Sequence, residues 1–180
     1  MFCRIHIFGA SGSGTSTLGL RLSDRLDARF LDNDSYYWLN TNPPFTQKRP
    51  PVERIEMIDH DVAGVRRWIL SGSVCGWGDP LIDRFTLAVF LYLSPKTRMQ
   101  RLADRERERY GSRIESGGDM HATHLGFMDW ARNYDDGKPP IRSLELHEKW
   151  MCRLACPIIR LDSSRPVDEL CDAVIERSVT

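Results

Sequence analysis

The sequence has no excess of charge of one sign and no long apolar run. Its 180 residues carry 25 Lys and Arg against 25 Asp and Glu, so the formal net charge is zero. This balance argues against a protein that holds nucleic acid mainly by bulk charge. No run approaches the roughly 20 apolar residues that a membrane-spanning helix needs, and the N-terminus lacks a signal-peptide pattern. We therefore expect a cytoplasmic protein whose partners include neither a membrane nor a nucleic acid.

The sequence also lacks a framework of cysteines. Five cysteines stand at positions 3, 75, 152, 156 and 171, and an odd number without paired spacings is typical of reduced thiols. The spacing of Cys152 and Cys156 would suit one helix face, but no second pair and no nearby histidine completes a zinc set. The hydrophobic fraction of 41% is enough for a packed core, and the length fits one domain with an insertion.

No internal repeat is present, and segments typical of strands and helices alternate instead. The predicted strands cover residues 4–8, 30–31, 68–70, 87–93 and 158–161. The predicted helices cover residues 15–26, 52–67, 95–109 and 166–178, where apolar residues recur at helical spacing or a proline opens the segment. This order predicts an α/β fold, a five-stranded parallel sheet with helices on both faces. Ligands bind such sheets beyond the carboxyl ends of the strands, where Gly9–Ser16, Asp32–Asp34 and Ser71–Ser73 fall.

The strongest motif is the glycine-rich run Gly9–Thr17, which reads GASGSGTST. It fits G-x-x-x-x-G-K-[ST] at every position except the lysine, which is Thr15 here. Glycines let the backbone wrap an oxygen cluster with inward N–H groups, and the following helix adds its N-terminal dipole. Ser16 stands where a hydroxyl would bind Mg²⁺. A ligand-free turn is the alternative, but the strand before and the helix after favour a nucleotide site. The expected nucleotide-binding residues are Gly9, Ala10, Ser11, Gly12, Ser13, Gly14, Thr15, Ser16 and Thr17.

With this motif the chain resembles the P-loop kinases of the adenylate kinase type, which include nucleoside monophosphate, shikimate and gluconate kinases. The resemblance also rests on the acidic end of the second strand, the run Ser71–Ser73, an arginine-rich helix and a lid-like insertion, and it extends to bacterial adenylate kinase-like proteins. Thr15 departs from the pattern, since it cannot place positive charge at the β- and γ-phosphates. Archaeal-type cytidylate kinases similarly carry threonine here, in a G-S-G-T-T-T run.

The resemblance implies one P-loop kinase-like domain over residues 1–180. Within it, residues 33–67 would form an acceptor-binding insertion and residues 110–145 a lid-like insertion. ATP and Mg²⁺ are the cofactors that it implies, with a nucleotide and a small-molecule acceptor as partners. A monomer and a homodimer both remain open.

The acidic residues Asp32 and Asp34 follow the second strand. In the similar kinases, an acidic residue here accepts a hydrogen bond from the acceptor hydroxyl or holds Mg²⁺ through water, and a carboxylate can act as a general base. A helix cap or turn is the alternative, favoured less for Asp34 and weighed equally for Asp32. Aromatic side chains nearby could stack on a base or sugar, or belong to the core. The expected substrate-binding residues are Asp32, Tyr36, Trp38, Arg49 and Gly72.

Four arginines, Arg98, Arg101, Arg105 and Arg109, share one face of the helix predicted after Pro95. The resemblance implies that Arg101 and Arg105 point at the phosphates, where a planar guanidinium binds bidentately and could replace the lost lysine charge. The interleaved acidic residues favour a solvated, salt-bridged face for Arg98 and Arg109.

Beyond this helix, Asp119, His121 and His124 could ligate a metal only if folding supplied a further ligand. A mobile lid with a glycine hinge, followed by a helix that Asp119 caps, is the favoured interpretation.

These features predict an ATP-dependent, Mg²⁺-requiring small-molecule kinase with Asp34, Arg101 and Arg105 as catalytic residues and Ser16 as the metal ligand. A nucleoside monophosphate is one candidate acceptor, although Ser71–Pro80 lacks the acceptor-binding arginine of adenylate kinases. The alternative is an ATP- or GTP-binding regulatory module without phosphoryl transfer. A nucleic-acid end kinase is disfavoured by the zero net charge.

Overall fold

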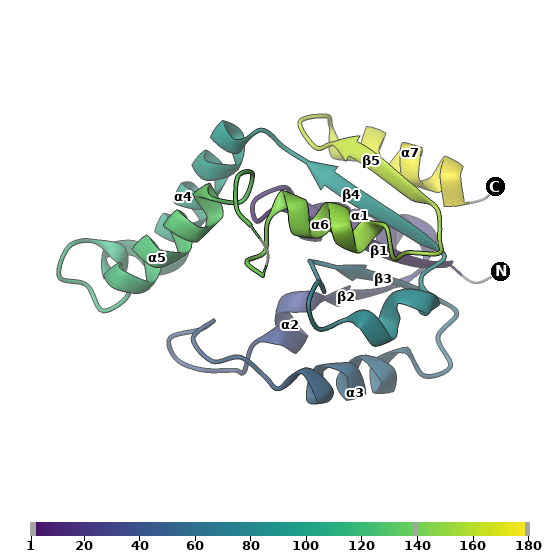
Figure 1. The fold of residues 1–180 in the computed structure, drawn as a ribbon, viewed down its shortest axis with the longest axis horizontal. Coiled ribbons are helices and arrows are strands. Elements are labelled where there is room, and N and C mark those ends of the chain that lie inside the picture. The colour runs from purple at the N-terminus through teal and green to yellow at the C-terminus, as the bar shows by residue number, and fades with distance from the viewer. Residues whose placement is uncertain (1–2, 139, 179–180) are drawn as a thin grey trace.

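The computed structural model shows five parallel strands in one sheet, in the order β2-β3-β1-β4-β5 (Figure 1). It describes residues 3–138 and 140–178. Residues 1–2, 139 and 179–180, which include both ends of the predicted domain and one position of the predicted lid, lie outside the described residues. The predicted sheet is thereby confirmed. Its strands are β1 (Cys3–Gly9), β2 (Arg29–Asp32), β3 (Arg67–Ser71), β4 (Leu87–Tyr92) and β5 (Ile158–Asp162).

The central strand β1 pairs with β3 on one side and β4 on the other. Ile5 lies opposite Ile69 of β3 and Leu87 of β4, and all three side chains are buried. Burial on both faces explains the continuous apolar runs of these strands. The order of strands reverses beside β1, so the loop after β1 lies at the switch point where α/β sheets bind ligands.

Helices cover both faces of the sheet. Leu18 and Val174, from α1 and α7, pack on one face, and Ile58 and Trp150, from α3 and α6, pack on the other. Helices α4 and α5 lie side by side and project beyond the sheet (Figure 1). The helices are α1 (Thr15–Leu26), α2 (Asn33–Tyr37), α3 (Pro51–Val62), α4 (Pro95–Tyr110), α5 (His121–Arg132), α6 (Leu144–Met151) and α7 (Val167–Ser178), with 3₁₀ turns η1 (Asp79–Arg84) and η2 (Gly111–Ile114). None of the helices in the described part of the chain has the length and apolar character needed to cross a bilayer.

The predicted helices were wrong in two respects. The helix expected over residues 52–67 ends at Val62, because Gly64 adopts a left-handed φ of 73° and Arg67 already belongs to β3. Two short helices, α2 and α6, were not predicted. Each begins at a capping side chain: Asp32 accepts the N–H of Asp34, and Ser143 accepts that of Leu146. A cap and two turns leave too few residues for a periodic pattern.

The cap predicted for Asp119 was also wrong. Met120 occupies the N-cap position of α5 and makes no side-chain cap. The two carboxylate oxygens of Asp119 instead accept hydrogen bonds from Arg113 at 2.9 and 2.6 Å. This bidentate pair ties Asp119 to the 3₁₀ turn that precedes it and removes it from the helix end.

Candidate functional site

The glycine loop connects β1 to α1 in a conformation that its glycines make accessible. Gly12 and Gly14 have positive φ angles of 82° and 91°, a region that other residues enter at a cost. At Gly9, an added Cβ would lie 2.4 Å from the carbonyl oxygen of Leu91, so only glycine fits there. Gly14 is the N-cap of α1, without a side-chain cap, and leaves N–H groups of the first turn available to an anion.

Two cavities, of about 970 and 730 Å³, open beside this loop. The first, called here the loop cavity, runs along Gly12–Leu18 toward Ser163 and Arg165. The second, called the aromatic cavity, extends from Gly9–Gly12 toward Tyr37, Trp77, Phe127 and Trp130. The two cavities meet in one cleft, because they share the residues Gly12, Thr15, Ser16, Asp32, Asp34, Trp38, Pro44, Phe45, Arg105 and Arg109.

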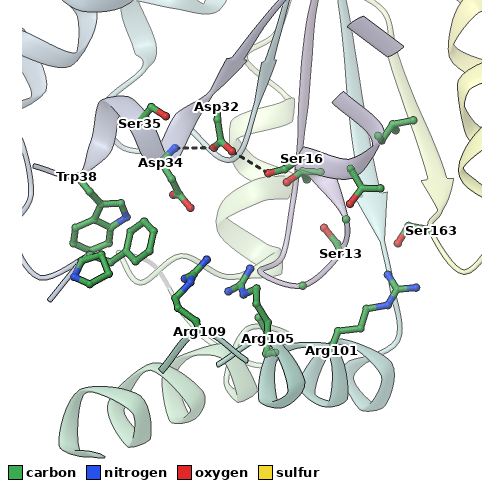
Figure 2. Close-up of a pocket in the computed structure, with 18 of the residues that line it drawn as sticks. Ser13, Ser16, Asp32, Asp34, Ser35, Trp38, Arg101, Arg105, Arg109 and Ser163 are labelled. Atoms are coloured by element: carbon green, nitrogen blue, oxygen red, sulfur yellow. Dashed lines mark hydrogen bonds between the residues drawn. The ribbon is translucent and has the colours of Figure 1, made fainter. Parts of the chain in front are cut away.

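An acidic corner lies where the cavities meet (Figure 2). The Ser16 hydroxyl donates a hydrogen bond to Asp32 Oδ2 at 3.4 Å, while Asp32 Oδ1 accepts the backbone N–H of Asp34 at 3.0 Å. Asp32 therefore caps α2, as one of the two interpretations weighed for it predicts, and it also contacts the loop. A hydroxyl and a carboxylate are the hard oxygen ligands that Mg²⁺ prefers, and the pair fits such an ion chemically.

Asp34 faces the cleft from the first turn of α2 (Figure 2). The side chain is open to solvent, but the protein around the cleft partly displaces water. This desolvation, followed by the charge of Asp32, raises the pKa of Asp34, against the lowering influence of Arg142, Arg105 and Arg109. A carboxylate with a raised pKa is a stronger base at neutral pH.

Three arginines of α4 line the wall opposite the loop: Arg105 and Arg109 point toward the acidic corner, and Arg101 points past the loop toward Ser163 (Figure 2). Arg101 Nη1 lies 3.9 Å from where a Cβ on Gly14 would stand. Arg105 is exposed, but the protein around the cleft partly displaces water from it, and this desolvation, followed by the charge of Arg109, lowers its pKa. Arg109 lines both cavities, with its guanidinium 4.6 Å from the ring centre of Phe45. Arg109 is exposed and lies 4.0 Å from Glu106, as expected for a solvated, salt-bridged face. That face also lines the cleft, because the helix face that carries Arg101 and Arg105 carries Arg109 too.

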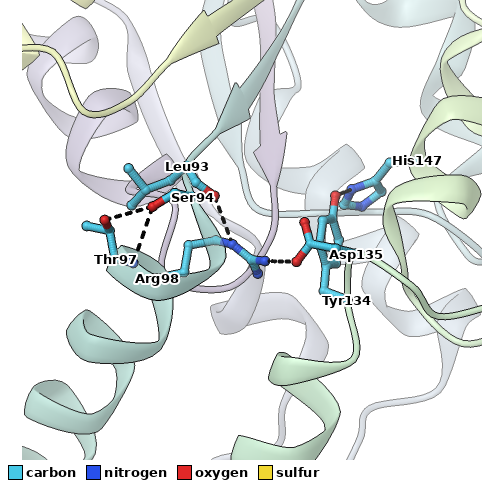
Figure 3. A network of polar contacts seen from close by, with 7 residues as sticks. All are labelled: Leu93, Ser94, Thr97, Arg98, Tyr134, Asp135 and His147. Atoms are coloured by element: carbon cyan, nitrogen blue, oxygen red, sulfur yellow. Dashed lines mark hydrogen bonds and ion pairs between the residues drawn. The ribbon is translucent and has the colours of Figure 1, made fainter.

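Arg98 was also expected on a solvated face, and the structure corrects this. Its side chain is 1% exposed. Nε donates to the carbonyl of Leu93 at 3.0 Å, and the guanidinium forms an ion pair with Asp135 (Figure 3). Arg98 lies in the first turn of α4 and contacts the chain that follows α5. Its ion pair with Asp135 therefore connects these two segments.

The substrate-binding residues expected from the sequence are only partly brought together. Trp38 lines both cavities, Arg49 lines the loop cavity and Gly72 the aromatic cavity. Tyr36 lines neither cavity: it is 4% exposed, and its hydroxyl donates to Asp61 at 2.8 Å. Tyr36 faces away because the one-turn helix α2 turns it toward α3, while the adjacent Tyr37 enters the aromatic cavity.

Sequence reasoning missed two arginines of the aromatic cavity, Arg54 and Arg142. Arg142 Nη2 donates to Ser11 Oγ of the glycine loop at 3.0 Å, although the two residues are far apart in sequence. Arg54 lies within α3, where its neighbours are mostly exposed. Neither residue belongs to a motif, so no signal in the sequence distinguished them from surface arginines.

A buried polar network fixes the chain around Arg142. His147 of α6 contacts Ser73 Oγ through Nε2 at 2.8 Å and Tyr134 Oη through Nδ1 at 2.6 Å. Burial, and then Arg142, lowers the pKa of His147 to about 3, so the ring is neutral and supplies one donor and one acceptor. Tyr134 also stacks beside Arg98 (Figure 3). The network therefore ties Tyr134 and His147, the two ends of the segment that contains Arg142, to each other and to Ser73, which follows β3.

Comparisons with known proteins agree with this fold. Residues 5–122 match AAA_18, described as an AAA domain. "Uncharacterized protein YqaC" of Bacillus subtilis (strain 168) is 45% identical over 172 residues, which cover 96% of this chain and 95% of that protein.

Solved kinases share the fold at low sequence identity. Shikimate kinase from Bacteroides thetaiotaomicron superposes with a TM-score of 0.61 at 19% identity, covering 99% of both chains. Deoxyadenosine kinase from M. mycoides with bound dATP has a TM-score of 0.60 at 14% identity, covering 98% of this chain and 100% of that chain. A gluconokinase from Sinorhizobium meliloti 1021 has a TM-score of 0.54 at 17% identity, and the match covers 98% of this chain and 91% of that chain. The chain belongs to the AAA_18 family and has the fold of these P-loop kinases.

Proposed function

We propose that the protein is an ATP-dependent, Mg²⁺-requiring kinase that transfers a phosphoryl group to a hydroxyl of a small molecule. One observation carries this proposal: the loop cavity and the aromatic cavity meet at Ser16, Asp32, Asp34 and Arg105. A donor nucleotide in one cavity and an acceptor in the other would bring their reacting atoms to that junction. The solved kinases of the same fold support this activity.

The proposed donor site is the glycine loop, Gly9–Thr17. Its N–H groups and the N-terminus of α1 would bind the phosphates of ATP. Ser16 and Asp32 would hold Mg²⁺, directly or through water, and this ion would neutralise charge between the β- and γ-phosphates.

In the proposed reaction the acceptor hydroxyl oxygen forms a bond to the γ-phosphorus, and the bond from that phosphorus to the β,γ-bridging oxygen breaks. ADP leaves, and the hydroxyl proton passes to Asp34. Asp34 suits this role because it faces the cleft and its pKa is raised. Much of the catalysis would come from positioning and charge neutralisation.

The charge that Thr15 cannot supply would come from α4. Arg101 lies beside Gly14, and Arg105 lines both cavities. Their planar guanidinium groups suit the oxygens of a phosphoryl group in transfer. We assign both as catalytic residues of the proposed kinase.

The proposed domain organisation keeps one kinase-like domain with two insertions. Residues 33–67 would form the acceptor-binding part, because α2 and the following loop contribute Asp34, Tyr37 and Trp38 to the cleft. Residues 110–145 would form the lid, because α5 and the chain after it contribute Phe127 and Arg142. An adenylate kinase-like enzyme is a second form of this proposal, in which a phosphate oxygen of a nucleoside monophosphate, rather than a hydroxyl, would attack the γ-phosphorus and Asp34 would position the acceptor without taking a proton.

The test is a search for acceptor-dependent ADP formation. Purified protein with MgATP is incubated with pools of small hydroxyl compounds, and products are followed by phosphorus NMR. Asp34→Asn should lower kcat by about 10²-fold or more with little change in nucleotide affinity, whereas the exposed control Asp24→Asn should not. Unchanged turnover in Asp34→Asn would exclude its assignment. Nucleotide binding without turnover for any acceptor would instead support the regulatory module, which the absence of the loop lysine favours.

A further inference from the structure

Arg54 is buried in the wall of the aromatic cavity, and no carboxylate among the described residues pairs with it. It is 5% exposed, and its Nε donates to the carbonyl of Arg49 at 2.7 Å. Its guanidinium lies 4.0 Å from the ring centre of Tyr37 and 5.1 Å from that of Trp77. Burial lowers the pKa of Arg54. The two rings fix the position of the guanidinium but leave its positive charge uncompensated.

Arg142 also lines the aromatic cavity, and its side chain is half-buried. Its polar contact is the neutral hydroxyl of Ser11, and its guanidinium lies 4.5 Å from the ring centre of Trp130. Its Nε is buried without a hydrogen-bond partner. Burial lowers the pKa of Arg142, and Asp34 offsets this only in part.

Within residues 3–138 and 140–178, no carboxylate forms an ion pair with Arg54 or Arg142. Buried arginines in folded proteins are normally paired, because an uncompensated buried charge is costly. Arg98 follows this rule through Asp135. The lining of the aromatic cavity has an excess of cations, with Lys48, Arg54, Arg105, Arg109 and Arg142 against Asp32, Asp34 and Glu106.

We infer that the aromatic cavity binds an anionic acceptor: a hydroxylated small molecule whose carboxylate or phosphate group pairs with Arg54 and Arg142. This inference rests on the proposed kinase function and names the substrate class. The anionic group would compensate the charges of both arginines, and the hydroxyl of the acceptor would lie toward Asp34. The cavity of about 730 Å³ is in the range of small-molecule sites. A neutral sugar or nucleoside would leave the two guanidinium groups unpaired.

The first test uses matched anionic and neutral probes on the wild-type protein. The donor site is saturated with MgAMP-PNP, a nucleotide that does not transfer its phosphoryl group. Thermal shift and calorimetry then compare meta-hydroxybenzoate with meta-hydroxybenzamide, CMP with cytidine, and inorganic phosphate at millimolar concentration. We expect at least one anionic probe to bind and its neutral counterpart to bind at least about tenfold more weakly. The benzoate and CMP arms distinguish carboxylate from phosphate.

The second test uses Arg54→Met and Arg142→Met, with the exposed Arg132→Met as the control. Each cavity variant should weaken binding of the anionic probe by about tenfold to a hundredfold, because a charged hydrogen bond is lost. The control should bind as the wild type does. The Arg142→Met protein without ligand should melt no lower than the wild type, since the substitution removes a poorly solvated charge that forms no ion pair within the described residues. This stability readout needs no knowledge of the natural acceptor.

Three results would overturn the inference: equal binding of neutral and anionic probes, wild-type affinity in both cavity variants, or no binding of any anionic probe to protein that binds AMP-PNP. Failure of AMP-PNP to bind would contradict the proposed kinase instead. The probe titrations are then repeated without nucleotide, and their outcome decides whether the anion site exists.

Discussion

Two fully buried histidines should make the protein markedly less stable below pH 6.5. His6 and His147 are both 0% exposed, and burial is the main cause that lowers their pKa values to about 4 and about 3. In the unfolded chain a histidine titrates near pH 6.5. At pH values between these limits the unfolded chain binds protons that the folded protein does not, so the free energy of unfolding falls as pH falls.

The magnitude follows from linkage. Each histidine costs about 1.4 kcal/mol per pH unit below its unfolded pKa, until the folded pKa is reached. From pH 7 to pH 5 the loss is therefore roughly 2 kcal/mol for each ring and roughly 4 kcal/mol for both. This is a large fraction of the 5–15 kcal/mol that typically separates folded from unfolded domains. Asp34 opposes the trend, because its raised pKa favours the folded state as pH falls.

Urea denaturation at pH 7, 6 and 5 measures this effect. In His6→Phe the new ring would stack on Phe8 and Phe85, as the imidazole does, but it cannot titrate. The loss of stability between pH 7 and pH 5 should fall by about half. His60→Gln is the control, since the His60 side chain is 89% exposed. A pH dependence in His6→Phe equal to that of the wild type would refute the assignment of the loss to buried histidines.

The remaining predictions concern the glycine loop and α4. Gly14→Val should cost about 1–3 kcal/mol of stability because a β-branched residue is strained at a φ of 91°, and calorimetry should show loss of MgATP binding; retained affinity would contradict the loop as the donor site. Arg105→Ala should lower kcat by about 10³-fold or more if it stabilises the transferring phosphoryl group, whereas the exposed Arg107→Ala should not, and single-turnover kinetics compares them. Thr15→Lys should tighten ATP binding without raising the transfer rate, as measured by calorimetry and rapid quench; a large gain in rate would show that the arginines do not replace the lysine.

The sheet and the glycine loop could be predicted from the sequence, because each depends on residues that are close together in the chain. The run Leu87–Leu93 is apolar because β4 is buried on both faces, and the glycines of Gly9–Thr17 are required by positive φ angles and close packing within the loop itself. The spacing of Arg101, Arg105 and Arg109 correctly placed them on one face of a helix. The sequence could not show whether that face meets solvent or the cleft, since this depends on where α4 packs.

The residues that were missed depend on contacts between distant segments. Arg142 reaches Ser11 only because His147 and Tyr134 anchor the chain after α5 to the sheet. Arg54 is buried because Tyr37 and Trp77, from two other segments, enclose it. Neither arrangement has a periodic pattern or a fixed spacing, so single-sequence reasoning has nothing to detect.

In the proposed mechanism, the positive charge at the phosphates comes from outside the glycine loop. A lysine in the glycine loop would be fixed to the donor phosphates, but in the proposed kinase the cations would come from α4 and from the segment before α6, as Arg101, Arg105 and Arg142. Their distance from the phosphates therefore depends on how α4 and the chain after α5 sit against the sheet. Arg142 contacts the loop at Ser11 and lines the acceptor side of the cleft. An anion bound there would pair with a residue that touches the donor loop, so acceptor binding and completion of the charged site would be coupled. Such coupling would favour transfer to the acceptor over hydrolysis of ATP by water.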